Sequence, residues 1–296
     1  MVVKYGCVLN RERPRYGSIN QVSFVYKMNN HTSKNFIFLA GLHRSGTSLL
    51  HEIIKGHARI SGFENTGVPE DEGQHLQTVY NPGIVYGGAG KFAFNTESHM
   101  DETHELATES SAQELMRQWS NYYDMDCEYL VEKSPPNIVR LRFLQKLFPQ
   151  SKFVVILRHP IAVSYATQKW SKTSIPSLID HTLVAYEKFL ADMKYIDSLF
   201  VLRYEEFVQN PQDKLDEIFD FIGMDSVKVN QTVNADVNEK YFNTWEKNRA
   251  SFVHRIFNRI PASYEPRAKQ CGYSLANYRE LQAVDWLGIK KIELQS

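Results

Sequence analysis

One short segment, residues 41–48 (GLHRSGTS), combines glycines, hydroxyl residues and an arginine in a way that suggests anion binding. It follows the apolar run 35–40 (NFIFLA), and residues 47–57 after it place leucines and isoleucines at helical spacing. This order predicts a strand, a loop and a helix. Backbone N–H groups at such a helix start carry partial positive charge and bind phosphate or sulfate oxygens.

The side chains of this loop suit the same task. Gly46, with Gly41, permits a tight turn and a close approach of the anion. Hydroxyl donors and one fixed cation come from four residues: Arg44, Ser45, Thr47 and Ser48. The plainer alternative is a strand-to-helix turn in which Ser and Thr only cap the helix.

The loop departs from the nucleoside-triphosphatase pattern GxxxxGK[ST]. Gly41 and Gly46 fit that pattern, but Thr47 stands where the lysine is required. The positive charge lies upstream instead, at Arg44.

The stretch FLAGLHRSGTSLL, residues 38–50, resembles the 5′-phosphosulfate loop of sulfotransferases that use 3′-phosphoadenosine-5′-phosphosulfate (PAPS). It is most similar to the tyrosylprotein-sulfotransferase-like and bacterial branches, in which an arginine precedes SGT. The resemblance implies that Arg44, Ser45, Gly46, Thr47 and Ser48 hold the 5′-phosphosulfate.

Two further segments extend the resemblance. Residues 132–137 (EKSPPN) precede an expected helix, and residues 151–160 (SKFVVILRHP) follow it. By the family pattern, Lys133 contacts the transferring sulfuryl group or the bridging oxygen, and Arg158 contacts the 3′-phosphate. Ligands of open α/β sheets bind beyond the carboxyl ends of strands, which agrees with these positions. The alternatives are a surface lysine and an ordinary salt bridge.

The family places a serine eight residues after this arginine, on the 3′-phosphate, but position 166 here is Ala166. Of the nearest hydroxyls, Ser164 and Thr167, we expect Ser164 to take that contact. In the segment LRYEEF, the resemblance puts Tyr204 beside the adenine; a core tyrosine is the alternative.

Further along the chain, Trp245, Lys247 and Arg249 resemble only loosely the loop that closes over the nucleotide. The motifs cover about residues 35–225, and the resemblance is faint elsewhere.

Transfer requires a base that takes the acceptor's proton. Glu64 is the first choice as a catalytic residue, because tyrosylprotein-like relatives place a glutamate there. His75 is the alternative, since its unperturbed pKa suits neutral pH. Both residues also have structural interpretations. Glu64 could form a salt bridge to the loop arginine, and His75 could be a hydrogen-bonded structural histidine. The acidic residues 70–72 form a solvated face or, if they line the acceptor site, favour a neutral or cationic acceptor.

The elements that must position these residues alternate along the chain. Strands are expected at four places: 35–40, 128–132, 153–157 and 199–202. Besides the helix at 47–57, helices are expected at 105–123, 137–148, 179–195 and 214–222. This alternation predicts an α/β fold, the P-loop-containing sulfotransferase-like fold, with a central parallel β-sheet flanked by helices. Residues 61–100 are rich in Gly, Asn and Pro and predict a long functional loop.

Residues 1–34 are expected to form an N-terminal extension packed on the domain, and residues 35–296 a single sulfotransferase domain. No stretch of 18 apolar residues occurs, and the N-terminus has no signal-peptide core, which predicts a cytoplasmic enzyme without a membrane partner.

Composition narrows the partners further. Acidic and basic residues are equal at 34 each, so overall charge gives no reason to expect nucleic acid. Three separated cysteines and the histidines form no metal-binding pattern, so no metal is expected.

The sequence thus predicts a sulfotransferase that moves a sulfuryl group from PAPS to a hydroxyl or amine of a small molecule and leaves 3′-phosphoadenosine 5′-phosphate (PAP). Two other functions remain open: a kinase-like phosphotransferase using ATP and magnesium, and a non-catalytic nucleotide-binding protein.

Overall fold

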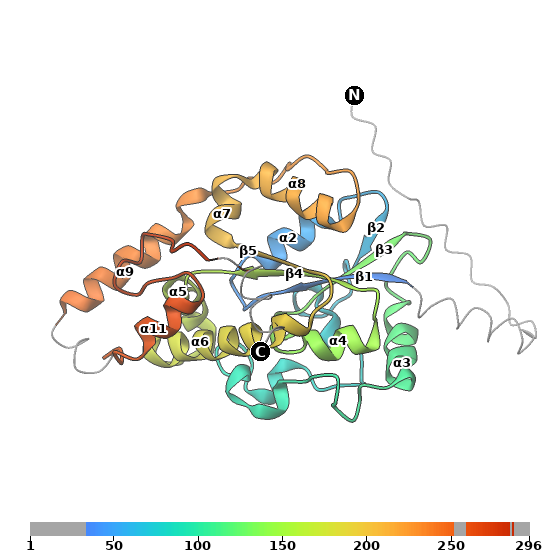
Figure 1. Ribbon diagram of the computed structural model, residues 1–296, viewed down its shortest axis with the longest axis horizontal. Helices are drawn as coiled ribbons and strands as arrows, with labels where there is room; N and C mark the ends of the chain where they lie inside the picture. The colour runs from blue at the N-terminus through green and yellow to red at the C-terminus, as the bar shows by residue number, and fades with distance from the viewer. Residues whose placement is uncertain (1–33, 252–258, 285, 287–296) are drawn as a thin grey trace, which may run out of the picture.

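The computed structural model describes residues 34–251, 259–284 and 286. Within this part of the chain, one sheet has five parallel strands in the order β2-β3-β1-β4-β5 (Figure 1). Their bounds are β1 Asn35–Ala40, β2 Ile60–Gly62, β3 Tyr129–Lys133, β4 Lys152–Leu157 and β5 Leu199–Arg203. The predicted α/β fold with a central parallel sheet is confirmed.

The register brings the carboxyl ends of the strands to one rim. Leu39 of β1 pairs with Lys133 at the end of β3, and Leu157 of β4 pairs with Arg203 at the end of β5. β1 lies in the centre of the sheet, so the loop after it is flanked by the ends of β3 and β4. Both faces of the sheet are covered, which explains why the strands read as continuous apolar runs.

Alternate side chains of β1 enter two separate cores. Ile37 and Leu39 pack in one core against three helices, α2 (Thr47–Ile54), α7 (Tyr204–Gln209) and α8 (Pro211–Ile222). Figure 1 shows these helices together on one face of the sheet. This alternation follows from the pleat of a strand, in which successive side chains point to opposite faces.

The opposite face carries a larger aromatic core. Phe36 and Phe38 stack with a centroid distance of 5.2 Å, and Phe38 stacks on Phe153 of β4 at 5.5 Å. The helices that cover this core are α3 (Glu109–Trp119), α4 (Leu141–Leu147), α5 (Pro160–Ser171) and α6 (Ile175–Asp192). Two later helices join this side of the fold, α9 (Glu239–Ala250) beside α5 and α11 (Tyr264–Gln270) beside α6.

The helix predicted at 137–148 is two elements. A 3₁₀ helix at Pro135–Val139 ends at Arg140, whose φ of −138° is not helical, and α4 begins after it. The buried Arg140 side chain donates to the carbonyls of Ser98 at 3.3 Å and Asn81 at 3.0 Å. Arg140 therefore holds the long segment 61–100 against the sheet.

Helix α5 was not predicted, because its first turn places Ile161, Ala162 and Val163 in succession rather than at helical spacing. Pro160 occupies its first turn, and the His159 ring caps it by accepting from the Ile161 amide at 3.2 Å.

The predicted loop 61–100 is built from short turns of 3₁₀ helix rather than from open coil, after the two residues it shares with β2. The bounds are Pro69–Asp71, Gly73–His75, Gly83–Tyr86, Phe92–Phe94 and Thr96–Ser98. Short 3₁₀ turns satisfy backbone groups locally, which lets this long connection pack on the domain.

The N-terminal extension expected at 1–34 lies outside the described residues except for Lys34, whose ammonium group donates to the carbonyl of Met125 at 2.7 Å. That residues 35–296 form one domain stays a prediction. None of the helices in the described part of the chain has both the length and the apolar character needed to cross a bilayer.

Candidate active site

The loop between β1 and α2 adopts a conformation that its residue types allow. Arg44 and Gly46 have φ values of 69° and 103°, in the left-handed region. A Cβ atom on Gly46 would lie 2.6 Å from the Tyr204 ring, so only glycine fits there. The Ser45 hydroxyl is buried and donates to the carbonyl of Leu42 at 2.6 Å, which ties the turn together.

Helix α2 begins at this loop with Gly46 as its N-cap, and no side chain caps it. The first N–H groups of a helix have no partner within the helix. Thr47, Ser48 and Leu49 supply these groups and also line a pocket. The start of α2 is therefore open to the pocket, and the anion binding expected there stays a prediction.

The pocket has a volume of about 260 Å³ and lies at the carboxyl rim of the sheet. Its lining includes six residues that sequence reasoning had selected: Arg44, Gly46, Thr47, Ser48, Arg158 and Tyr204. It also includes others that come from segments far apart in the sequence: His43, Glu70, Glu72, Pro135, Trp170, Val237, Lys240 and Tyr241.

Arg158, directly after β4, contacts the loop between β1 and α2. Its guanidinium donates to the backbone carbonyl of Arg44 at 2.6 Å, although the two residues are 114 positions apart. The same group lies over the Tyr204 ring, with its carbon 4.1 Å from the ring centroid. Arg158 thus fixes the shape of the loop and still lines the pocket.

A buried hydrogen-bond network through Asn238, the Asn238 relay, supports the Arg158 side chain. Asn238 accepts two hydrogen bonds from the Arg158 guanidinium, at 2.9 and 2.6 Å, through its side-chain oxygen. Its amide nitrogen then donates to Glu205 at 2.7 Å, and Glu205 also accepts from the backbone amide of His159 at 2.9 Å. Burial raises the pKa of Glu205. Each member therefore has a partner, which is what a buried polar network needs.

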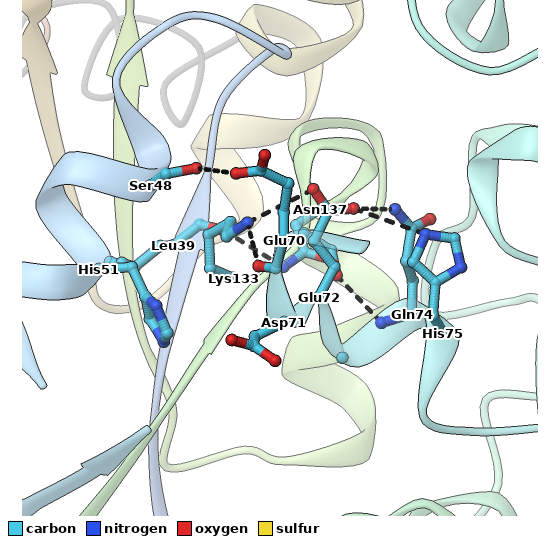
Figure 2. Close-up of polar contacts among 12 residues, drawn as sticks. Leu39, Ser48, His51, Glu70, Asp71, Glu72, Gln74, His75, Lys133 and Asn137 are labelled. Carbon is cyan, nitrogen blue, oxygen red and sulfur yellow. Dashed lines mark hydrogen bonds and ion pairs between the residues drawn. The ribbon is translucent and has the colours of Figure 1, made fainter. Parts of the chain in front are cut away.

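Lys133 ends β3 and is only 1% exposed. Its ammonium group donates to the backbone carbonyl of Glu70 at 2.8 Å and to the Glu72 carboxylate at 3.4 Å. Figure 2 shows Lys133 pointing toward these two residues, while Ser48 of α2 donates to the Glu70 carboxylate at 3.1 Å. Lys133 therefore lies directly behind two acidic residues of the pocket wall.

A comparison with protein-family models matches residues 36–228 to the sulfotransferase family. The chain belongs to the sulfotransferase family. The match covers the phosphate loop, Lys133, Arg158 and Tyr204, so the recognition made from the motifs is confirmed.

Solved structures of family members are similar to this chain. The sulfotransferase domain from the curacin biosynthetic pathway is 17% identical, with a TM-score of 0.48, over 82% of this chain and 99% of that one. The sulfotransferase domain from the Synechococcus olefin synthase is 18% identical, with a TM-score of 0.46, over 71% of this chain and 87% of the other. A Mycobacterium tuberculosis sulfotransferase is 14% identical, with a TM-score of 0.47, over 75% of this chain and 74% of that one. No curated protein matches the sequence.

The structure does not bring every predicted residue of this family member to the pocket. Ser164 is fully buried and lines a small separate cavity behind the loop, with no hydrogen-bond partner for its hydroxyl. Its expected contact with a 3′-phosphate has no support from this geometry. Trp245 is buried in the core and Lys247 is exposed, and neither lines the pocket.

The two predicted bases lie at different places. Glu64 is 65% exposed and faces Lys55 at 3.8 Å rather than the pocket. His75 does not line the pocket either, and its Nε2 lies 3.8 Å from the Glu72 carboxylate. Their roles stay predictions.

Sequence reasoning missed several residues of the pocket wall. Trp170 stacks on the Arg44 guanidinium, with 4.8 Å from its carbon to the ring centroid. Val237, Lys240 and Tyr241 also line the pocket, a few residues before the segment that resembled the closing loop. A lysine beside a tyrosine is weak as a sequence signal, but a search for cations that began a few residues before that segment would have included Lys240.

The pocket lining carries both signs of charge. Arg44, Arg158 and Lys240 supply cations, whereas Glu70 and Glu72 supply carboxylates next to Lys133. Burial and the nearby Lys133 lower the pKa of His43 to about 4, so its imidazole is neutral at neutral pH. Among the described residues, no group of three acidic, histidine or cysteine side chains is arranged to hold a metal ion.

Proposed function

We propose that this pocket binds PAPS and that the protein transfers its sulfuryl group to a hydroxyl or amine of a small-molecule acceptor. The observation that carries the proposal is the meeting of Arg44 and Arg158 in one pocket, with Lys133 immediately behind its wall. A nucleotide that carries a sulfate and two phosphates needs such a convergence of cations from separate segments.

The residues present fit the two ends of the nucleotide. The free N–H groups at the start of α2, with Thr47, Ser48 and Arg44, suit the 5′-phosphosulfate. Arg158 and Lys240 suit the 3′-phosphate, and Lys240 supplies a contact that Ala166 lacks. Tyr204 keeps the predicted role beside the adenine, although the Arg158 guanidinium already covers part of its ring.

Lys133 is suited to stabilise the transferring group. By analogy with phosphoryl transfer, in-line sulfuryl transfer relies on positioning and on charges that are already in place. A buried ammonium group has few water competitors, so its interaction with an oxygen that gains negative charge is strong. In this proposal PAP is the product, and the reaction uses no metal.

The two acidic residues of the pocket bear on the acceptor. Glu70 and Glu72 line it, and their charge favours a neutral or cationic acceptor over an anionic one. A small molecule with a hydroxyl or amine group fits this description, without nucleic acid or membrane as a partner. A cytoplasmic location belongs to the same proposal.

Calorimetric titration tests the donor. We expect PAP to bind and ATP with magnesium to bind far more weakly, because Thr47 replaces the lysine of nucleoside-triphosphatase loops. Preferential binding of ATP with magnesium would contradict the proposal. An Arg59→Ala variant is the control for loss of a cation outside the pocket, and its PAP affinity should match that of the wild type. Arg59 is exposed and pairs with Glu128, and neither residue lines the pocket.

Product analysis tests the transfer. The purified protein is incubated with PAPS and a panel of phenols, alcohols, amines and an anionic glycan, and both PAP and sulfated product are measured. We expect sulfation of neutral or cationic members. If PAP binds but no member is sulfated, the protein is a nucleotide-binding protein without transferase activity toward this panel. Sulfation of the glycan alone would contradict the proposed acceptor class.

A further inference from the structure

Glu72 is the acidic residue that the structure places most firmly in the pocket wall. Its side chain lines the pocket yet is only 7% exposed. One carboxylate oxygen accepts from the Gln74 amide at 2.5 Å, and the other lies 3.4 Å from the Lys133 ammonium group. A carboxylate has about four acceptor positions, so Glu72 keeps capacity for a further hydrogen bond.

The backbone after Glu72 is bound to strand β3. The amide of Gly73 donates to the Glu132 carboxylate at 3.0 Å, and the amide of Gln74 donates to the Ser134 hydroxyl at 3.0 Å. Ser134 in turn donates to Glu132 at 2.5 Å. Glu132 and Ser134 flank Lys133, so these bonds fix Glu72 relative to the ammonium group beside it.

The neighbouring acidic and basic candidates are less well placed. Glu70 accepts from Ser48, a residue of the loop that the donor would occupy. Glu64 and His75 do not line the pocket, and His75 meets Glu72 on the side of the Gln74 contact, at the same carboxylate oxygen. As a base, His75 would have to receive the acceptor's proton from outside the pocket lining, whereas Glu72 lies in that lining.

We propose that Glu72 is the catalytic base that takes the acceptor's proton, and that Glu132 is a positioning residue that acts through the backbone of Gly73. In this step, which rests on the proposed function, the acceptor O–H or N–H proton moves to the Glu72 carboxylate. The acceptor's electron pair forms the new bond to sulfur. The bond between sulfur and the bridging oxygen breaks, and its electron pair stays on PAP beside Lys133.

The surroundings of Glu72 suit a base. Burial raises the pKa of its carboxyl, and the Lys133 charge partly offsets that rise. Four charged or titratable groups face it: Lys133 and Glu132 from β3, Glu70 from the preceding 3₁₀ turn, and His75 from the following one. A carboxylate with a raised pKa is a stronger proton acceptor than an exposed one.

The test compares kcat/KM across pH for the panel acceptor with the highest rate. A catalytic base must be deprotonated, so we expect the wild-type kcat/KM to rise with pH and then level off. Glu72→Gln should lower the plateau by about 10²- to 10⁴-fold and remove the rise, with PAP affinity unchanged. Glu72→Asp keeps a carboxylate and should retain the rise at a reduced rate.

The controls separate this inference from the proposed function. Glu52→Gln changes an exposed glutamate that pairs with Lys55 outside the pocket, and its profile should match the wild type. Three results would overturn the assignment: an active Glu72→Gln variant with an unchanged profile, loss of PAP binding in both Glu72 variants, or loss of the rise in Glu64→Gln or His75→Asn instead. Wild-type protein that fails to bind PAP would reject the proposed function itself.

Discussion

The Arg158 guanidinium donates a hydrogen bond to the backbone carbonyl of Arg44 at 2.6 Å. Through this bond, a cation at the end of β4 determines the conformation of the loop after β1, where Arg44 itself has a positive φ of 69°. A backbone in this sparsely populated region persists only when the surrounding structure holds it. The loop and the arginine are therefore one structural unit.

Asn238 is predicted to be the support of Arg158. Asn238→Ala removes the acceptor of two guanidinium hydrogen bonds and a donor to Glu205, all in a buried place. We expect the free energy of unfolding to fall by about 1–3 kcal/mol, the usual cost of an unsatisfied buried group, and PAP affinity to fall with it. Denaturation and calorimetry measure the two effects. Asn243→Ala, on the exposed side of α9, is the control; an equal loss in that variant would contradict the prediction.

Lys240 is predicted to recognise the 3′-phosphate. Lys240→Ala should weaken PAP binding by roughly 10-fold, the lower range for a hydrogen bond to a charged group, while AMP, which lacks that phosphate, should bind as before. Lys247→Ala is the matched control, because Lys247 lies on the same helix but outside the pocket. An equal loss for PAP and AMP would assign Lys240 to another part of the nucleotide.

Gly46 is predicted to tolerate no side chain. Gly46→Ala combines a left-handed φ of 103° with a Cβ atom 2.6 Å from the Tyr204 ring. Gly67→Ala has a similar backbone cost, at φ 84°, but its Cβ atom would meet nothing within 4 Å. We expect Gly46→Ala to lower the midpoint of thermal unfolding more than Gly67→Ala and to weaken PAP binding as well. Equal shifts in the two variants would show that the contact with Tyr204 adds no cost.

Stability should depend on pH through Glu132. Burial raises the pKa of this carboxyl to about 7, above the ordinary glutamate value of 4.5, so the folded protein holds a proton that the unfolded chain releases. The stabilising contribution is therefore complete below pH 4.5 and is lost as pH rises through about 7. Relative to Glu132→Gln, the wild type should lose roughly 3 kcal/mol at most between these limits. Urea denaturation of both proteins from pH 4.5 to 8 checks the sign. A wild-type free energy of unfolding that rises with pH relative to that of Glu132→Gln would contradict the prediction.

The sequence predicted those parts of the site that lie where regular elements end. The apolar runs of β1 and β4 are covered on both faces, so the ends of these strands were identifiable from pattern, and the family resemblance then selected Arg44 and Arg158 beside them. Strand β2 was not predicted, because three residues carry too little pattern and its place depends on pairing with β3.

The remaining parts of the site depend on contacts over long separations in the chain. Asn238 reaches Arg158 across 80 residues, and Gly73 reaches Glu132 across 59. Neither bond leaves a periodic or local signal, since one uses side chains and the other a backbone amide. The predicted base Glu64 followed a motif position, whereas the folded chain places its side chain near Lys55, the residue after α2, and outside the pocket lining.

The strand order separates two jobs in space. β1 stands between β3, which ends at Lys133, and β4, which Arg158 follows directly. Segment 61–100 is joined to the β3 side through Glu132 and Ser134, while the Asn238 relay belongs to the β4 side. The hydrogen bond from Ser48 to Glu70 links the loop after β1 to segment 61–100, so a change in that segment can reach the start of α2 without passing through the Asn238 relay.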